Sequence, residues 1–149
     1  MSFIRLDIPA VLLRYIEGLK THDVDQIVGT TAPELQFIAA TRVLTQAQFR
    51  AMISALYTGF PDWHYDHDPV ELHGERYAVR WRQGGTHTGV WAMPGMDPIP
   101  PTGKRVQIPP HYFHYRVANG LITEIHPEPI PGGAPRGILE QIGVPLPPL

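Results

Sequence analysis

Residues 106–128, VQIPPHYFHYRVANGLITEIHPE, carry the clearest β-sheet signal in the chain. The stretch is rich in β-branched and aromatic residues, which is typical of strands. Asn119 and Gly120 interrupt it, and Asn-Gly is the dipeptide most typical of a two-residue hairpin turn. We therefore predict two antiparallel strands, from Val106 to Val117 and from Leu121 to Glu128.

A second region with strand character lies upstream of this hairpin. Tyr77, Val79 and Trp81 alternate with the residues between them, a period of two that indicates a strand with two different faces. Gly84 and Gly85 follow, and a glycine pair favours a tight turn. The pattern predicts a second hairpin, whose returning strand covers residues 86–92.

The chain before residue 63 has helical rather than strand periodicity. Apolar residues recur at helical spacing over about residues 8–21 and again after Thr45, up to Gly59. A shorter helix begins after Asp23 and ends near Gly29, and residues 34–40 predict a short strand. Three helices followed by a meander indicate an α+β fold.

Proline is concentrated in the second half of the chain. Of 17 prolines, 13 lie from Pro94 onward, which excludes long helices there and favours strands joined by stiff loops. The loop from Trp91 to Lys104 is predicted to be a flap over a pocket mouth or an arm across a dimer interface. Residues 136–142 predict a short last helix, and the tail 145–149 is expected to pack extended on the surface or on a neighbouring subunit.

The composition is that of one globular domain covering residues 1–149. The chain has 43% hydrophobic and 17% charged residues and a formal charge of −2. Dispersed Lys and Arg argue against nucleic acid as a partner, and the first ten residues resemble neither a signal peptide nor a membrane span. Cysteine is absent, which removes disulfides and thiolate chemistry. We expect a cytoplasmic protein that does not enter membranes.

Eight histidines raise the question of a metal site. His64 and His67 have a ligand-like spacing among three aspartates, but along a strand they fall on opposite faces. The sequence therefore predicts no metal.

Several short motifs follow one another in a characteristic order. They are HDVD at 22–25, FPDW at 60–63, Arg80-Trp81, GTHTG at 85–89, PTGK at 101–104, GLITE at 120–124 and QIG at 141–143. In this order and spacing the chain resembles, over nearly its whole length, the SnoaL-like polyketide or ester cyclases of the nuclear-transport-factor-2-like (NTF2-like) superfamily.

The resemblance implies a cone-shaped α+β fold, with about five or six antiparallel strands in a curved sheet and three N-terminal helices over its concave face. It also implies a homo-oligomer, with a dimer favoured, and an apolar, carbonyl-bearing, polyketide-like substrate that is cyclised by intramolecular aldol condensation without a cofactor. Because one fold hosts many functions, hydrolysis, dehydration, isomerisation and passive binding of a small molecule remain open alternatives.

The last long strand departs from the family pattern. Relatives commonly place Trp and then a catalytic Asp after the Glu of this strand, whereas here Glu124 is followed by His126 and Glu128. These three side chains share one face of the strand. On the preceding strand, His114 shares a face with Tyr112 and Arg116. If the two faces coincide inside the cone, a carboxylate and an imidazole meet. We predict Glu128 or Glu124 as the base, and His114 or His126 as the proton donor or orienting group.

Two further interpretations concern the same strands. Glu124 has an alternative role as the acceptor of a bracing ion pair from Arg116 or Arg80. His111 follows the pair Pro109–Pro110, which can introduce a bulge and turn its side chain to either face. The residues predicted to line the pocket are Tyr15, Trp63, Trp81, Trp91, Tyr112, His111 and Arg116.

Overall fold

The computed structural model describes residues 7–145, which form four helices and seven strands. In chain order these are α1 (Ala10–Thr21), α2 (Val24–Gly29), β1 (Thr31–Ile38), β2 (Val43–Leu44), α3 (Gln46–Gly59), β3 (His64–His67), β4 (Glu71–His73), β5 (Arg76–Thr86), β6 (Arg105–Ala118), β7 (Leu121–Pro127) and α4 (Arg136–Ile142). Of the helices between residues 7 and 145, none has the length and apolar character needed to cross a bilayer.

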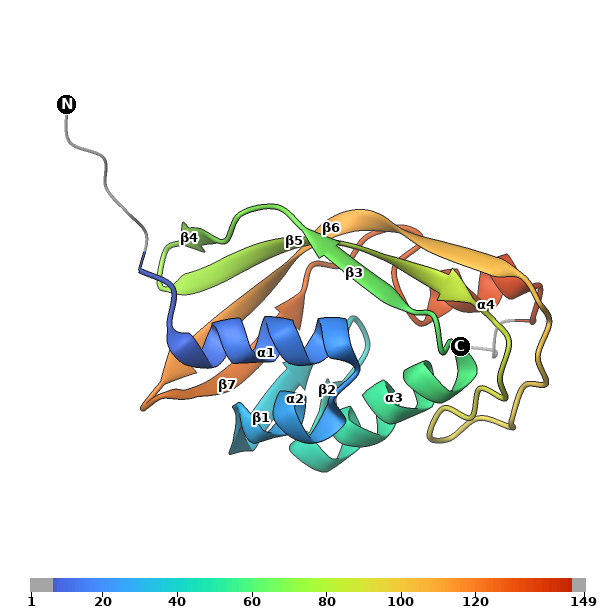
Figure 1. Cartoon of the computed structure of the whole chain (residues 1–149), viewed down its shortest axis with the longest axis horizontal. Helices are drawn as coiled ribbons and strands as arrows, with labels where there is room; N and C mark the ends of the chain where they lie inside the picture. The colour runs from blue at the N-terminus through green and yellow to red at the C-terminus, as the bar shows by residue number, and fades with distance from the viewer. Residues whose placement is uncertain (1–6, 146–149) are drawn as a thin grey trace.

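All seven strands belong to one curved sheet, and α1, α2 and α3 lie along one side of it (Figure 1). The strand order is β2-β1-β7-β6-β5-β3, and β4 pairs with the first residues of β5. The predicted α+β class and the three N-terminal helices over the sheet are confirmed. The sheet is mixed rather than wholly antiparallel, because β1 runs parallel to β7.

The helix starts follow the capping signals of the sequence. At α3 the Thr45 hydroxyl accepts a hydrogen bond from the Gln48 amide at 3.2 Å, and the Gln48 side chain accepts one from the Thr45 amide at 2.9 Å. This reciprocal capping box satisfies two amides that the first turn leaves unpaired. The Asp23 carboxylate likewise accepts from the Gln26 amide at the start of α2. Local chemistry therefore places both helices.

The predicted turn at Gly84–Gly85 is wrong. Strand β5 continues through both glycines, which pair with Gln107 and Val106 of β6. A Cβ on Gly84 would lie 2.5 Å from the Val106 carbonyl oxygen, and one on Gly85 would lie 3.0 Å from the Trp63 backbone. These glycines permit close approach of neighbouring chain segments, not a reversal.

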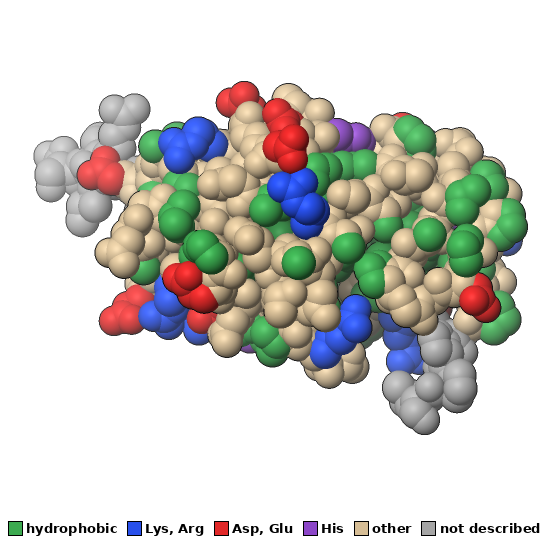
Figure 2. All heavy atoms as spheres, turned by 90° about the horizontal axis from the view of Figure 1, so that it is seen from below, with side chains coloured by type: hydrophobic (Ala, Val, Ile, Leu, Met, Phe, Trp, Pro, Cys, Tyr) green, Lys and Arg blue, Asp and Glu red, His purple; other side chains and the backbone are tan. Residues whose placement is uncertain are grey.

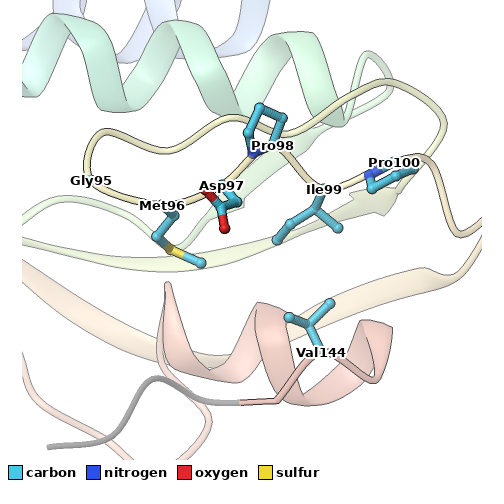
Figure 3. Close-up of a pocket in the computed structure, with 7 residues that line it drawn as sticks. All are labelled: Gly95, Met96, Asp97, Pro98, Ile99, Pro100 and Val144. Atoms are coloured by element: carbon cyan, nitrogen blue, oxygen red, sulfur yellow. The ribbon is translucent and has the colours of Figure 1, made fainter.

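The segment after β5 leaves the sheet as a long loop, residues 87–104, instead of a returning strand. Within it Trp91 and Ile99 form an isolated antiparallel bridge. The base of the loop is closed at His87, whose amide donates to the Lys104 carbonyl and whose carbonyl accepts from the Gly103 amide. Residues 95–100 of this loop and Val144 line an open hollow of about 450 Å³ beside the end of α4 (Figure 3).

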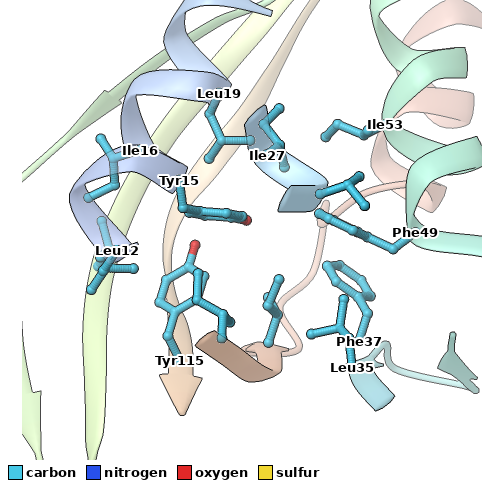
Figure 4. Packing of buried hydrophobic residues seen from close by; sticks show 14 of the residues in the cluster. Leu12, Tyr15, Ile16, Leu19, Ile27, Leu35, Phe37, Phe49, Ile53 and Tyr115 are labelled. Carbon is cyan, nitrogen blue, oxygen red and sulfur yellow. The ribbon is translucent and has the colours of Figure 1, made fainter. Parts of the chain in front are cut away.

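Two apolar clusters hold the layers together. The larger lies between α1, α2 and α3 and the sheet, where Tyr15 meets Tyr115 edge to face at 5.2 Å and Phe37 stacks on Phe49 at 5.3 Å (Figure 4). The smaller cluster contains Phe60, Trp63, Trp91, Val106, Ile108, Ile138, Leu139 and Ile142. Residues of both clusters line one cavity.

Candidate functional site

A cavity of about 1010 Å³ lies between the helices and the inner face of the sheet. Its walls come from α1, α3, α4, β1, β3, β5 and β6, and it is bordered by the proline-rich segment 127–136 and by Met93 and Met96 of the 87–104 loop. The cavity is large enough for a polycyclic small molecule. Its position between two rigid layers means that it is built into the fold.

The cavity wall is apolar and uncharged apart from one border. Aromatic side chains form much of it, among them Tyr15, Phe49, Trp81 and Phe113. The charged residues that line it are Glu128, Arg136 and Glu140, which belong to or flank the proline-rich segment and α4. A ligand inside this cavity therefore meets neutral groups over most of its surface.

The tyrosines of the interior act as hydrogen-bonding groups and not as bases. Burial raises the pKa of Tyr15 and Tyr65 well above the usual value, and it raises the pKa of Tyr57 to about 12. The Tyr57 hydroxyl donates to the Leu19 carbonyl at 3.3 Å. These phenols stay protonated at neutral pH.

His111 is a buried imidazole in the cavity wall. His111 is only 6% exposed, and its Nδ1 atom lies 2.9 Å from the Pro109 carbonyl oxygen. Because a carbonyl only accepts, Nδ1 carries the hydrogen, and Nε2 holds the lone pair when the ring is neutral. Among the described residues no group hydrogen-bonds to Nε2. The backbone thus presets His111 as a proton acceptor through Nε2.

The bulge after Ile108 explains why His111 faces the cavity. In the ladder between β5 and β6, Trp81 pairs with His111 but Gln83 pairs with Ile108, so β6 holds one extra residue at Pro109–Pro110. A bulge shifts the alternation of side chains by one position. Ile108 and His111 consequently both point inward, followed by Phe113 and Tyr115.

Gln83 is the second polar side chain that the sheet presents to the cavity, and sequence reasoning missed it. Its residue is 7% exposed, and its Oε1 accepts a hydrogen bond from the Trp63 indole nitrogen at 3.3 Å. The alternation through Trp81 was the available signal, because Gln83 continues the inward-facing series by two residues. Two glycines follow Gln83, and because a glycine pair favours a turn, the sequence alone does not extend the strand through Gln83.

Most of the residues predicted to be catalytic lie on the outer face of the sheet. His114 pairs directly with His126, and Arg116 pairs with Glu124, so these four side chains share one face. That face is opposite the one that carries His111, because side chains alternate along β6. The structure therefore brings the predicted imidazoles and Glu124 together, but outside the cavity.

Glu124 is held in an ion-pair network on this outer face. Its carboxylate lies 2.7 Å from Arg76 and 3.5 Å from Arg116, and its side chain is 15% exposed. This geometry matches the interpretation of Glu124 as the acceptor of a bracing ion pair. The second arginine is Arg76 and not Arg80, because Arg80 pairs with Asp68. A shift in the ladder at Thr123 turns Glu124 outward while Ile122 and Ile125 stay buried.

Glu128 stands at the border between the two faces. The residue contributes to the cavity rim, but its carboxylate lies 3.7 Å from His114 Nε2 on the outer side. Of the predicted pocket-lining residues, Tyr15, Trp63, Trp81, Trp91 and His111 are in the cavity wall. Tyr112 and Arg116 are on the outer face, where the Tyr112 hydroxyl donates to Glu71 at 2.7 Å.

The described part of the chain, residues 7–145, contains no group of three or more His, Asp or Glu side chains arranged to hold a metal.

Acidic and basic side chains are interspersed on the face seen in Figure 2, and hydrophobic side chains gather at the end where the 87–104 loop lies in Figure 1. Apart from the charged residues at its border, the cavity wall includes the polar groups of His111 and Gln83 and the hydroxyls of Tyr15 and Tyr65.

Solved structures show where else this architecture occurs. AclR from Streptomyces galilaeus, a candidate hydroxylase, is 21% identical, with a TM-score of 0.71 over 90% of this chain and 93% of that one. A candidate SnoaL-like polyketide cyclase from Jannaschia sp. CCS1 is 19% identical, with a TM-score of 0.71 over 97% of this chain and 100% of that one.

A protein from Catenulispora acidiphila with a ketosteroid isomerase-like fold, solved with trimethylamine, is 15% identical, with a TM-score of 0.63 over 93% and 96% of the two chains. Among curated proteins, no sequence matches this chain. The family model of the SnoaL-like domain matches residues 12–125, which include every strand except the end of β7. The chain therefore belongs to the SnoaL-like domain family.

Proposed function

We propose that this protein is an enzyme that moves protons on a neutral, apolar, carbonyl-bearing small molecule bound in the cavity. The observation that carries the proposal is His111, a buried imidazole with a fixed tautomer in the wall of a large apolar cavity. The sharpest form of the proposal is cyclisation of a polyketide-like substrate by intramolecular aldol condensation, without a cofactor.

The proposed reaction begins at the carbon next to a substrate carbonyl. His111 Nε2 takes a proton from this carbon, the C–H electron pair forms the enolate, and the imidazole becomes a cation that donates to the Pro109 carbonyl through Nδ1. The enolate carbon then forms a bond to a second carbonyl carbon of the same molecule. The alkoxide produced takes the proton back from Nε2, so no group is consumed.

The structure also supports a proposal about assembly. Helices α1, α2 and α3 lie on the inner side of the sheet and leave the outer face of β5, β6 and β7 uncovered (Figure 1), and this outer face carries the half-buried side chains of Tyr112 and His114. We propose that a second copy covers this face in a cytoplasmic homodimer. Light scattering on the purified chain measures the mass directly, and a monomer at micromolar concentration would contradict the dimer.

The test of the reaction uses 2-tetralone, a neutral bicyclic ketone with acidic protons next to its carbonyl. In deuterated buffer, proton NMR follows exchange of these protons with solvent. The protein should accelerate exchange above buffer, and His111→Gln should lose roughly 100-fold or more of that acceleration. His64→Gln is the matched control, because His64 is an exposed imidazole on β3 that does not line the cavity.

Two outcomes would contradict the proposal. Unchanged exchange in His111→Gln would exclude this imidazole as the base. Binding of 2-tetralone by the wild-type chain without any acceleration of exchange would favour the alternative of a non-catalytic binding domain.

A further inference from the structure

The Gln83 side chain lines the cavity, and one half of its carboxamide is hydrogen-bonded within the fold. The Trp63 indole nitrogen can only donate, so the atom that receives its hydrogen bond at 3.3 Å is the Gln83 oxygen. This fixes the amide orientation and leaves the NH₂ group on the other side. Within residues 7–145 that NH₂ group has no acceptor, although Gln83 is 93% buried and lines the cavity.

Trp63 is itself held rigidly, so it acts as a clamp on Gln83. The residue is 2% exposed, and its ring packs edge-on against Phe60 at 5.4 Å. The ring also covers Gly85, where an added Cβ would lie 3.0 Å from Trp63 Cε3. The absence of a side chain at Gly85 is therefore what lets the indole reach the Gln83 oxygen.

Gln83 and His111 are neighbours on the inner face of the sheet. Trp81 lies directly opposite His111, and Gln83 is the next inward-facing residue on β5. The Gln83 nitrogen is not among the fully buried unpaired atoms of residues 7–145, so a ligand or water in the cavity that Gln83 lines can accept its hydrogen bond. A donor beside a proton acceptor is the pair of groups that enolate formation requires, because charge develops on oxygen as the proton leaves carbon.

We propose that the Gln83 NH₂ group binds the carbonyl oxygen of the substrate and stabilises the enolate that His111 generates, with Trp63 as the residue that positions it. This inference rests on the proposed function and assigns the subsite that holds the reacting carbonyl. The donor is neutral, so the subsite suits ketones and other uncharged carbonyl compounds.

The experiment compares 2-tetralone with tetralin, which has the same ring system without the oxygen. Isothermal titration calorimetry should show that the wild-type chain binds the ketone about three- to tenfold more tightly than the hydrocarbon, the worth of one hydrogen bond. Gln83→Glu keeps an acceptor for Trp63 but removes the donor. This variant should lose the preference for the ketone, and its exchange rate should fall roughly 100-fold.

Trp63→Phe tests the positioning role. It keeps an aromatic ring against Phe60 and removes the indole N–H, so the Gln83 amide is free to turn. The affinity ratio of ketone to hydrocarbon should fall toward one, whereas damage to packing alone would weaken both ligands equally and leave the ratio unchanged.

A measurement on the wild-type chain keeps the inference testable if a variant does not fold. In a nitrogen–proton correlation spectrum, 2-tetralone should move the side-chain amide signals of Gln83 more than tetralin does. Gln141 is the internal control, because its amide already donates to Gln107 at 2.8 Å and its oxygen accepts from Gln107 at 2.9 Å.

The failures of the two proposals are distinguishable. If His111→Gln loses exchange but Gln83→Glu retains both exchange and the ketone preference, the subsite is wrong and the proposed reaction stands. The wild-type chain could instead prefer the ketone in a way that depends on Gln83 and yet not accelerate exchange. That result would support the subsite and contradict the proposed reaction. A wild-type chain that binds neither compound, or both equally, overturns the subsite.

Discussion

The two faces of the sheet carry different chemistry. The inner face presents aromatic rings, one glutamine and one imidazole to a cavity of about 1010 Å³. The outer face carries ion pairs such as Arg76 with Glu124 and the cross-strand pair of His114 and His126. Charged groups keep their hydration and partners outside, whereas the polar groups that the sheet presents to the cavity are neutral amides, imidazoles and hydroxyls.

This comparison shows that titratable residues are not by themselves a guide to the active side of a sheet. The four side chains predicted to be catalytic, His114, Glu124, His126 and Glu128, lie on the outer face or at its edge. The inner face holds fewer polar groups, but each is oriented by a specific partner, Pro109 for His111 and Trp63 for Gln83. Orientation by a fixed neighbour is the better sign of a prepared site.

The largest effect on stability should come from the inner face, and two consecutive residues of β5 test this. Trp81 is 1% exposed, and its indole donates to the Tyr115 hydroxyl at 2.9 Å. Trp81→Ala should lower the free energy of unfolding by about 3–5 kcal/mol, measured by urea titration. Arg80→Ala, one residue away on the outer face, should change the urea midpoint little. Equal losses would remove the distinction between the faces.

A smaller loss is expected for Glu124→Gln on the outer face. The substitution leaves two arginines without their half-buried carboxylate, and we expect a loss of about 1–3 kcal/mol in the free energy of unfolding. Asp68→Asn is the control, because Asp68 holds Arg80 and Arg82 at more exposed positions and should matter less. A fall in exchange of 2-tetralone without a loss of stability would restore Glu124 to the catalytic role that the sequence predicted.

The smallest effect concerns pH and His87, at the base of the 87–104 loop. Its Nδ1 accepts a hydrogen bond from the Thr102 amide at 3.2 Å, and burial lowers the pKa of His87. The unfolded chain, with an ordinary histidine pKa of about 6.5, therefore binds the proton more readily than the folded chain. Stability should be complete above about pH 6.5 and decline as the pH falls toward the pKa of the folded state.

His87→Asn isolates this contribution, because its side-chain oxygen can accept from Thr102 but does not titrate. Urea titrations between neutral and mildly acidic pH should show a shallower decline for the variant. Parallel curves for the two chains would show that His87 does not contribute. Asp62, whose pKa is lowered through its hydrogen bonds to Thr86, should act only at lower pH.

Local signals made much of the fold predictable. The capping residues Thr45 and Gln48 mark the start of α3, and Asn119 and Gly120 both adopt the positive φ angles, 53° and 75°, that their turn requires. The motif order was sufficient to identify the family that the model of residues 12–125 confirms. These features depend on a few neighbouring residues, which is why a single sequence reveals them.

The site was less predictable because it depends on register. Pro109–Pro110 indicated a bulge, but only the pairing of Gln83 with Ile108 shows that His111 turns inward. The shift at Thr123, which turns Glu124 outward, has no comparable marker in the sequence. A displacement of one residue exchanges the two faces of a strand, and alternation alone does not say which face is buried.

The parallel pairing of β1 with β7 has a consequence for how the chain folds. Thr31 aligns with Ile122, 91 positions later, whereas β5, β6 and β7 are joined in sequence order. Closing so long a loop is entropically unfavourable, so the antiparallel meander should form first and the β1 strand should dock late. Since the cavity is bounded by β1 and α3 on one side and the meander on the other, we expect it to form only at this final step. If refolding is monitored through the binding of a ligand such as 2-tetralone, the binding signal should therefore appear with the slowest phase, after most of the backbone hydrogen bonds have formed.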